Sequence, residues 1–483
     1  MVEDVRAQKL MLKVLLCQPP LHIGTNVFLP EEVSNRLSCF PSLGLLSVRA
    51  GLKQKAGIDA EYLDAEALLL DIPATADRIA RAAPDIVGLS MDSFTLPITH
   101  RLACEIKRRL PEVIVAAGGV HPTIYPERTA ALSCIDWAFC GEADYSFADA
   151  AVAWKERGEP DVKGVAYSRE GQIVFTGSPD PLDDLDSLPM PDRSGIPLDE
   201  YFSAPAKSRP VLSLITSRGC PFSCTFCDRP ILSNRFRMRS ADLVVQEVME
   251  LKELGAKELS FYDDNFTVNK KRVRSIADSL AEHGAPIPFD MRSRVDTVDA
   301  ELIELLAAAG CRRIYFGVES GDPEVLDRIS KGINLDQAKS IFSKAKQHGI
   351  RRLAYFMFGL PGENEEAARR TVAFAETLDA DFYLFEAFIP MPATQAYDEA
   401  VRSGLYQVDH WAAQAENPDP AFVPPTYPGE MTSEQVEQVM REAYRRTMMT
   451  PGFLLRSLLD IRSLRELITK VKAGLGFFRM QSR

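Results

Sequence analysis

Three cysteines, Cys220, Cys224 and Cys227, lie close together in the segment SRGCPFSCTFCDRP, directly after the apolar, strand-like run Val211–Ile215. Thiolates at this spacing can each bind one iron of a four-iron cluster. Because the loop offers only three thiolates, one iron stays open to a substrate. The triplet therefore predicts a catalytic cluster rather than a simple electron carrier.

The alternative for these cysteines is a zinc knuckle. Structural zinc usually takes a fourth Cys or His at a paired spacing. The next cysteine along the chain is Cys311, and His283 lies inside a helical pattern. The spacing thus favours a 4Fe-4S cluster, with the three cysteines as its metal ligands and as the catalytic centre.

With Phe226 directly before its last cysteine, the triplet resembles the signature of the radical S-adenosylmethionine (SAM) superfamily. The resemblance implies that SAM binds the open iron through its amino and carboxylate groups. It also implies that the reduced cluster cleaves SAM to a 5′-deoxyadenosyl radical, which abstracts hydrogen from an unactivated carbon. Such chemistry requires an electron donor such as ferredoxin or flavodoxin.

Strands and helices alternate around and after this loop, which predicts a partial (βα)6 barrel of the TIM type. Amphipathic helices such as Ala241–Leu254 and Leu335–His348 separate the strands. The predicted strands are Val211–Ile215, Glu258–Tyr262, Ile287–Met291, Arg313–Gly317, Leu353–Phe358 and Phe382–Phe385.

Polar side chains follow these strands, at the end of a barrel where reacting groups gather. Arg292 or Arg294 can bind the carboxylate of SAM, and Glu319 can accept hydrogen bonds from its ammonium or ribose. Asp263 and Asp264 offer further acceptors, although either can equally cap the helix that follows.

The adenine of SAM needs a slot that backbone can approach closely. Gly359 and Gly362, in the segment GLPGEN, allow such an approach because they lack side chains. The resemblance implies that Phe226 adds backbone contacts to the same base.

The first part of the chain also alternates between strands and helices, which predicts an α/β fold with a doubly wound, Rossmann-like parallel sheet. Such sheets bind ligands in the loops after their strands. The predicted strands are Leu12–Cys17, Ala60–Leu63, Ile86–Ser90, Val113–Ala117 and Trp137–Cys140.

The loops after these strands contain the segments GLSMDSF, GGVHPT and CGEAD. Taken alone, they fit tight turns and a structural histidine as well as a ligand site. Together with PSLGLLSVRAGL they resemble the cobalamin-binding domain that precedes many radical SAM domains. The Asp-x-His-x-x-Gly loop of other cobalamin proteins is missing, which puts a histidine ligand to cobalt in doubt. The residues that the resemblance places near cobalamin are Ser90, Gly118, Gly119, His121, Thr123 and Glu142.

These patterns divide the chain into four parts: a cobalamin-binding domain at 1–150, a connector with a β-hairpin at 151–210, a radical SAM barrel at 211–390 and a mostly helical C-terminal region at 391–483. The hairpin turns at Glu170–Gly171. The final segment, from Phe453 onward, is amphipathic. It either packs on the barrel or lies against a membrane or a lipid-like substrate.

Composition narrows the class of protein. The 483 residues have a net charge of −12 and are 46% apolar, which argues against nucleic-acid binding. Nine unevenly spaced cysteines and an oxygen-sensitive cluster require a reducing compartment. With no secretory signal and no apolar run of about 18 residues, a cytoplasmic protein is expected, with membrane association at the inner face as an alternative through the C-terminal helix.

The resemblance implies a cobalamin-dependent radical SAM methyltransferase that acts on an unactivated carbon of a small-molecule or lipid-like substrate. An oxidative cyclase or ring-forming enzyme with the same cofactors is the first alternative. A tRNA methylthiotransferase fits less well, because the first domain lacks a second set of three cysteines. A cobalamin or SAM sensor without turnover is the alternative outside the enzymes.

Overall fold

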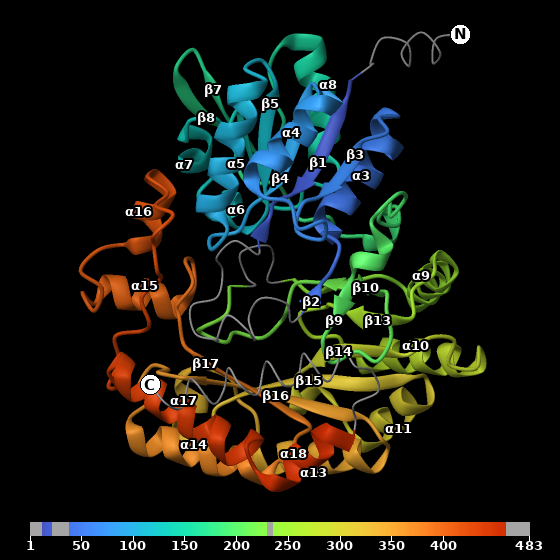
Figure 1. Cartoon of the computed structure of the whole chain (residues 1–483), viewed down its shortest axis with the longest axis vertical. Helices are drawn as coiled ribbons and strands as arrows, with labels where there is room; N and C mark the ends of the chain where they lie inside the picture. The colour runs from blue at the N-terminus through green and yellow to red at the C-terminus, as the bar shows by residue number, and fades with distance from the viewer. Residues whose placement is uncertain (1–11, 22–37, 229–234, 460–483) are drawn as a thin grey trace.

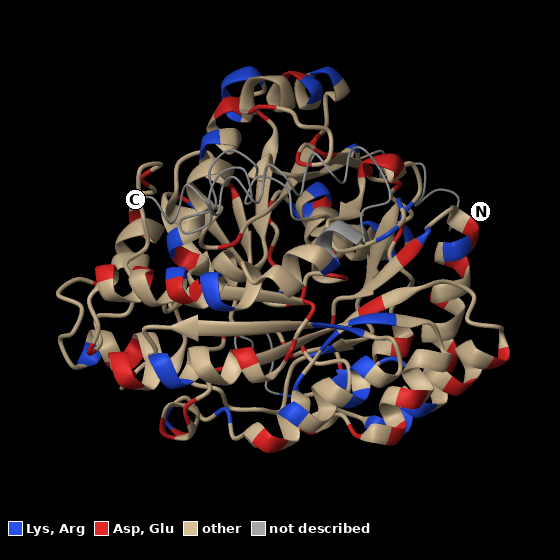
Figure 2. Ribbon diagram, turned by 60° about the horizontal axis from the view of Figure 1, so that its bottom comes forward, with Lys and Arg blue, Asp and Glu red and all other residues tan. Residues whose placement is uncertain are grey.

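The computed structural model describes residues 12–21, 38–228 and 235–459. Two sheets dominate this part of the chain, and they lie one above the other (Figure 1). The N-terminal sheet, blue to teal, faces the second sheet, green to orange, across a layer of loops. Basic and acidic residues are interspersed along the helices that cover the second sheet (Figure 2).

The N-terminal sheet has the strand order β3-β1-β4-β5-β6-β7-β8. The first five strands in this order are parallel, β7 is antiparallel to β6, and β8 is antiparallel to β7. Separate apolar cores form on the two faces, one beneath α3 (Leu43–Ala56) and α8 (Ser146–Arg157), the other beneath α4 (Ile72–Ala82) and α5 (Leu96–Arg109). The strands are β1 (Val14–Gln18), β3 (Glu61–Asp64), β4 (Ile86–Ser90), β5 (Ile114–Gly118), β6 (Trp137–Phe139), β7 (Val165–Arg169) and β8 (Gln172–Phe175).

The predicted doubly wound sheet is confirmed, but the hairpin lies in a different part of the fold from the one predicted. Its turn lies at Glu170 and Gly171, whose φ angles of 52° and 81° suit a tight hairpin. The sequence predicts that the hairpin belongs to the connector, but β7 pairs with β6, placing Tyr167 opposite Trp137. Both aromatic side chains are buried, so pairing covers the edge of the sheet with apolar surface. The hairpin is therefore part of the N-terminal sheet.

The second sheet has the order β10-β13-β14-β15-β16-β17, and every neighbouring pair is parallel. The six described strands form an open, partial barrel, as predicted. Its outer face carries α9 (Ala241–Leu254), α10 (Lys270–Glu282), α11 (Ala300–Ala308), α12 (Pro323–Arg328), α13 (Leu335–Gln347) and α14 (Glu365–Thr377). The strands are β10 (Val211–Leu214), β13 (Glu258–Phe261), β14 (Phe289–Ser293), β15 (Cys311–Glu319), β16 (Arg351–Phe358) and β17 (Phe382–Ala387).

Two strands end later than predicted, which changes where their polar residues lie. Arg292 is inside β14, and Glu319 is the last residue of β15. Phe289 and Met291 pack into the core beneath the helices. Arg292 therefore points to the opposite, concave face of the sheet, because side chains alternate along a strand.

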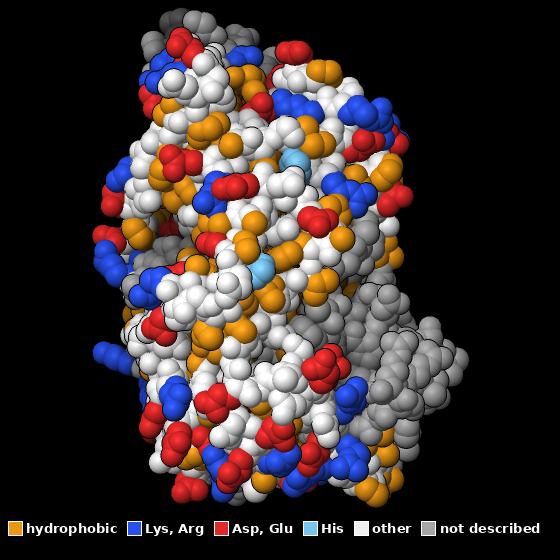
Figure 3. All heavy atoms as spheres, turned by 90° about the vertical axis from the view of Figure 1, so that its left-hand side faces the viewer, with side chains coloured by type: hydrophobic (Ala, Val, Ile, Leu, Met, Phe, Trp, Pro, Cys, Tyr) orange, Lys and Arg blue, Asp and Glu red, His pale blue; other side chains and the backbone are white. Residues whose placement is uncertain are grey.

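The C-terminal region contacts both domains. Helix α17 (Ser433–Met448) runs along β17, where the hydroxyl of Tyr444 accepts a hydrogen bond from the Phe385 N–H and donates one to its carbonyl, each at 3.1 Å. Helix α16 (His410–Glu416) lies against the N-terminal domain, with Trp411 edge-on to Phe94 at 5.4 Å between ring centroids. The chain after Phe388 thus spans the side of the molecule shown in Figure 3.

Two further helices belong to this region, α15 (Gln395–Arg402) before α16 and α18 (Pro451–Leu459) after α17. Most of the amphipathic segment that suggested a membrane contact lies outside the described residues. Within residues 12–21, 38–228 and 235–459, no helix is long and apolar enough to cross a membrane.

Candidate active site

The cysteine loop lies between two short antiparallel strands, β11 (Ser217–Arg218) and β12 (Arg237–Met238). Within the described residues, Cys220, Cys224 and Cys227 form no disulfide bond, and the first is buried whereas the others are half-buried. The Thr225 N–H donates to the carbonyl of Ile329 at 3.0 Å, which anchors the middle of the loop to the barrel. The three thiols therefore belong to one loop at the carboxyl end of β10.

The surroundings of the thiols fit an iron–sulfur cluster. Arg294 Nη1 donates a hydrogen bond to Cys224 Sγ at 3.4 Å, and its guanidinium lies 3.9 Å from the centroid of the Phe222 ring. Hydrogen-bonded thiolates beside apolar groups are the usual setting of such clusters. Among the described side chains, no three Cys, His, Asp or Glu residues are grouped as ligands of one ion. A four-iron cluster makes a different demand, because each thiolate binds its own iron.

Arg294 is committed to the cysteine loop. It forms an ion pair with Asp296 at 2.7 Å and donates to the carbonyl of Lys331. Burial alone would lower the pKa of Arg294, but Asp296 and the nearby charges of Cys224 and Cys220 raise it above its ordinary value. Arg294 thus supports the cluster loop, and its hydrogen bonds are directed to protein groups.

Arg292 lies in a different environment. Its guanidinium sits 3.5 Å from the ring centroid of Tyr262 and 5.0 Å from that of Tyr315, and Nη1 donates to Ser260 Oγ at 3.1 Å. Tyr262 is itself 41% exposed. Of the two arginines predicted to bind the carboxylate of SAM, Arg292 is the one held half-buried on the concave face.

Glu319 ends β15 in a strained conformation, with φ at 71°. Its carboxylate accepts a hydrogen bond from Lys331 Nζ at 2.7 Å, and the ammonium lies 5.9 Å from the ring centroid of Phe226. A side chain at Gly317 would collide with the Glu319 carboxylate. Gly317 therefore leaves room for an ion pair that reaches the cysteine loop.

The two aspartates in the loop after β13 have different roles. Asp263 is fully buried and accepts hydrogen bonds from the Thr216 N–H at 3.1 Å, from the Thr216 hydroxyl at 2.8 Å and from Ser217. It holds the chain just before the cysteines. The N-cap of α10 is Asn269, so Asp263 does not cap that helix. Asp264, the predicted acceptor for SAM, lines the cavity described below.

Gly359 and Gly362 follow β16 with φ angles of 81° and 72°, in a turn that few other residues tolerate. The turn is closed by Glu363, whose carboxyl group accepts hydrogen bonds from the N–H groups of Gly359 at 2.7 Å and Leu360 at 3.3 Å. Burial raises the pKa of Glu363 to about 8. Glu363 is not among the predicted site residues, although an acid directly after Gly362 is a signal for it in the sequence.

A cavity of about 410 Å³ separates the N-terminal sheet from the cysteine loop. Small residues at the strand ends line one side, among them Gly88, Gly118 and Gly141, and the opposite side includes Gly219 and Tyr262. The cavity thus opens along the carboxyl ends of the N-terminal strands, where doubly wound sheets bind ligands. Its lining is mostly apolar and glycine-rich, which suits a broad organic cofactor.

The residues predicted to bind cobalamin fall into two groups. Ser90, Gly118, Gly119 and Glu142 line the cavity. Thr123 instead connects two loops, because its hydroxyl donates to the Gly119 carbonyl at 2.7 Å and accepts from the Gly141 N–H at 2.9 Å.

His121 is also absent from the lining residues. Its side chain is fully buried, with Nδ1 3.1 Å from Ser93 Oγ, and burial lowers its pKa to about 4. This placement gives His121 a structural environment outside the cavity lining.

Four ion-paired residues connect the cavity to the cysteine loop. Glu142 pairs with Arg237 at 2.6 Å, and Asp144 binds Arg218 through both carboxylate oxygens, at 2.7 and 2.8 Å. Arg218 also approaches Glu142 at 3.3 Å. Sequence analysis did not foresee the two arginines, because their partners lie more than seventy residues away.

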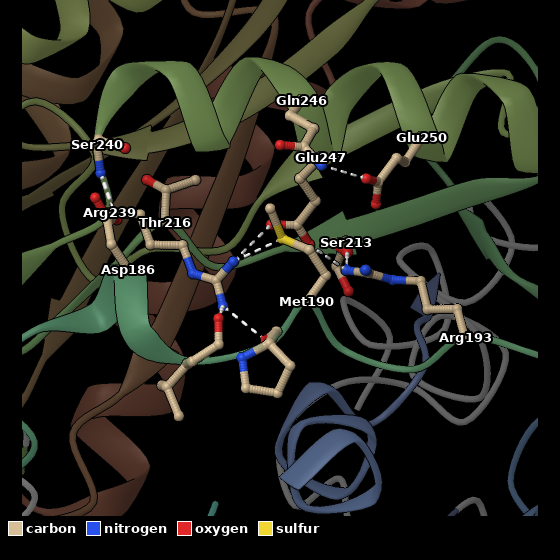
Figure 4. A network of polar contacts seen from close by, with 12 residues as sticks. Asp186, Met190, Arg193, Ser213, Thr216, Arg239, Ser240, Gln246, Glu247 and Glu250 are labelled. Atoms are coloured by element: carbon tan, nitrogen blue, oxygen red, sulfur yellow. Dashed lines mark hydrogen bonds and ion pairs between the residues drawn. The ribbon is translucent and has the colours of Figure 1, made fainter. Parts of the chain in front are cut away.

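The connector contributes a second polar network beside the first. Arg239 donates to the sulfur of Met190 at 2.6 Å and to the carbonyl of Pro189 at 3.0 Å. Arg193 pairs with Glu247 on α9 at 2.8 Å, and Figure 4 shows Arg239 and Arg193 approaching Glu247 from different sides. The connector is thereby attached to the barrel. Leu188 and Pro191 line the cavity, a role that sequence analysis did not assign to them.

Taken together, a doubly wound sheet, a cavity at its strand ends and a three-cysteine loop on an open barrel define a protein that brings an organic cofactor next to an iron–sulfur cluster. Comparison with known proteins agrees. Residues 214–375 match the family model of the radical SAM superfamily, and residues 33–151 match the B12 binding domain.

Relatives extend this match over nearly the whole chain. Uncharacterized methyltransferase PH0819 from Pyrococcus horikoshii is 31% identical over 457 residues, which cover 93% of this chain and 95% of that protein. Anaerobic magnesium-protoporphyrin IX monomethyl ester cyclase from Rubrivivax gelatinosus is 25% identical, with 80% and 70% covered. The cobalamin-dependent radical SAM enzyme OxsB, solved with aqua-cobalamin bound, has the same fold, with a TM-score of 0.75 over 99% of this chain and 73% of that one at 17% identity.

The chain therefore belongs to the cobalamin-binding branch of the radical SAM superfamily. The cofactors of this branch are a 4Fe-4S cluster, SAM and cobalamin. The fold and the three cofactors expected from the cysteine motif and the glycine-rich loops are confirmed.

Proposed function

We propose that this enzyme transfers a methyl group from SAM to an unactivated carbon of a small-molecule substrate. The observation that carries the proposal is the shared cavity, whose walls come from the strand ends of the cobalamin-binding sheet and from the residues next to the cysteine loop. Cobalamin held there supplies a methyl carrier, and the cluster with SAM supplies a carbon radical. Methyl transfer to carbon requires both at one substrate.

The residues of the barrel are suited to hold SAM beside the cluster. Arg292 is the proposed partner of the SAM carboxylate, since a guanidinium binds carboxylates through two parallel hydrogen bonds. Glu319 and Asp264 are the proposed acceptors for its ammonium and ribose groups. The turn at Gly359 and Gly362 is the proposed adenine contact, with Phe226 on the other side.

The substrate is proposed to lie on the concave face of the barrel. Phe385 packs edge-on against Tyr444 on the helical side of β17. Leu384 and Glu386 therefore point to the concave side, by alternation along the strand. Glu386 is solvent-exposed, yet the protein around it and then the charge of Glu319 raise its pKa. A face that combines Leu384, Glu386 and Arg292 suits a small molecule with polar and apolar parts.

A substrate-free experiment tests methyl transfer. SAM that gives up its methyl group becomes S-adenosylhomocysteine, whereas SAM that is cleaved reductively yields 5′-deoxyadenosine. Anaerobically reconstituted enzyme with reduced cobalamin and a chemical reductant is expected to form both products. The Cys220→Ala variant, as control, should lose both products, because the proposed SAM site is the open iron of the cluster that this variant cannot hold. Absence of S-adenosylhomocysteine from the wild-type reaction would overturn the proposal.

An oxidative cyclase is the second candidate, favoured by the likeness to the protoporphyrin ester cyclase. Such an enzyme needs the radical but has no need to consume the methyl group of SAM. Formation of 5′-deoxyadenosine alone, with cobalamin bound, would support it over methyl transfer.

The proposed partners are an electron donor and, for the C-terminal segment, a lipid surface. Reduced flavodoxin or ferredoxin should replace the chemical reductant in the same assay. Sedimentation with anionic liposomes, comparing the full chain with a truncation before Phe453, tests the lipid contact. Equal sedimentation of the two proteins would exclude it.

A further inference from the structure

The ribbon that carries the cysteine loop is attached to both domains. On the barrel side, Asp263 binds the backbone and hydroxyl groups just before Arg218. On the other side, Arg218 and its cross-strand neighbour Arg237 reach Asp144 and Glu142, in the loop that follows β6. We call the four residues Glu142, Asp144, Arg218 and Arg237 the clamp.

The clamp is largely removed from water. The side chains of Arg237, Asp144 and Glu142 are 3%, 9% and 10% exposed, and that of Arg218 is 25% exposed. Burial would raise the pKa of Asp144, but its hydrogen bond to Arg218 lowers it below the ordinary value. Buried, two-pronged pairs of this kind hold their partners in one geometry and cost several kcal/mol to break on one side.

Three of the four clamp residues also line the cavity. Glu142, Asp144 and Arg218 contribute to its wall, together with Gly141 before them and Gly219 after. Gly219 directly precedes Cys220. A molecule in the cavity therefore contacts one end of a short path whose other end is a ligand of the cluster. The acids at the cavity end are joined to Arg218 and Arg237 by charge-assisted hydrogen bonds, which depend steeply on distance and angle. From Arg218 the backbone continues through Gly219 to Cys220.

We propose that the clamp couples the two cofactor sites: Glu142 and Asp144 are positioning residues through which cobalamin in the cavity favours the arrangement of the cysteine loop that binds SAM. This inference rests on cobalamin occupying the cavity, and it requires no methyl transfer. By thermodynamic linkage, SAM must tighten cobalamin binding by the same factor. Couplings between sites are typically about 5- to 150-fold.

Binding measurements on the full, cluster-loaded chain test the coupling. The dissociation constant of SAM is measured by equilibrium dialysis, with and without saturating hydroxocobalamin. Wild type should bind SAM at least about fivefold more tightly with cobalamin. In the Glu142→Gln/Asp144→Asn variant that ratio should fall to about one, with full iron content. A substitution that affects only the SAM site or only the cobalamin site would change the dissociation constant of that ligand. It would leave unchanged the ratio of the SAM dissociation constants measured with and without cobalamin.

Two further variants serve as a control and as a milder test of the same contact. Asp149→Asn removes the exposed pair with Lys55 in the same domain and should keep the wild-type ratio. Arg218→Lys keeps the charge but removes the two-pronged geometry, so it should lower the ratio even if the double variant fails to fold. An unchanged ratio in Arg218→Lys, or a ratio of one in wild type, would overturn the coupling. Missing S-adenosylhomocysteine would instead count against methyl transfer and leave the coupling intact.

Discussion

Arg294 donates a hydrogen bond to the sulfur of Cys224 at 3.4 Å. The same guanidinium is held by Asp296 at 2.7 Å, so its direction toward the sulfur is set by a second residue. Hydrogen bonds to cysteine sulfur stabilise the reduced, more negative cluster and raise its reduction potential. Arg294 is thus placed to tune how easily the cluster accepts an electron.

Replacing Arg294 by Lys should make the cluster harder to reduce. A lost hydrogen bond of about 1 kcal/mol corresponds to a shift of roughly 40 mV for one electron, toward negative potential. An anaerobic redox titration followed by electron paramagnetic resonance measures the shift. An unchanged potential with normal iron content would show that the contact does not act on the cluster.

Arg292→Lys is the matched variant, because Arg292 lies two residues before Arg294, inside β14. Because Arg292 is proposed to bind the SAM carboxylate, its replacement should weaken SAM binding about tenfold, which corresponds to about 1.4 kcal/mol. The reduction potential without SAM should stay at the wild-type value. The opposite pattern in the two variants would reverse the roles given to the arginines.

Glu363→Gln should change how stability depends on pH. Burial raises the pKa of Glu363 to about 8, so the folded state binds a proton more tightly than the unfolded chain. Its contribution is full below the ordinary pKa of about 4.3 and is lost as pH rises toward 8, by up to about 1.4 kcal/mol per unit. Denaturant unfolding of both proteins at several pH values should show the variant gaining relative stability from pH 5 to pH 8. Parallel curves would mean that Glu363 is charged in the folded protein.

Gly51→Ala should displace the backbone of Asp144, one of the clamp residues. A methyl group at Gly51 would collide with the backbone carbonyl of Asp144, whereas one at Gly44, in the same helix, would meet nothing within 4 Å. Overpacking of this kind costs about 1–3 kcal/mol. Gly51→Ala should lower both the unfolding free energy and the cobalamin effect on SAM binding, and Gly44→Ala should not lower the unfolding free energy. Equal stability of the two variants would contradict the close packing of α3 on this loop.

His121→Phe should leave the coordination of cobalt unchanged. The imidazole is fully buried beside Ser93, outside the cavity lining. Electron paramagnetic resonance of bound cob(II)alamin reports a nitrogen ligand through its splitting. Wild type and variant should give the same spectrum, and a splitting lost in the variant would identify His121 as a ligand.

Much of this arrangement could be predicted from local patterns. The cysteine spacing, the alternation of strands and helices, and the glycines after β5 and β6 are all encoded by residues close in sequence. Strand ends were less certain: Arg292 was expected after its strand and lies inside it, because periodicity marks a strand better than its boundary.

Long-range partners could not be read in the same way. Nothing near Arg218 indicates an acid at Asp144, and nothing near Glu142 indicates that Arg237 will neutralise it. His121 illustrates the converse, since a histidine in a glycine-rich loop suggests a ligand until its burial is known. These assignments depend on how two domains pack, which no single segment encodes.

The two hydrogen bonds between Tyr444 and the backbone of Phe385 have a consequence for association between molecules. An open barrel leaves its last strand with backbone groups that can pair with a strand of another chain. Here a phenol on α17 occupies one N–H and one carbonyl at the middle of β17, and the helix shields the strand. Tyr444 thereby does for this edge what a further strand would do in a closed barrel: it removes a template for aggregation.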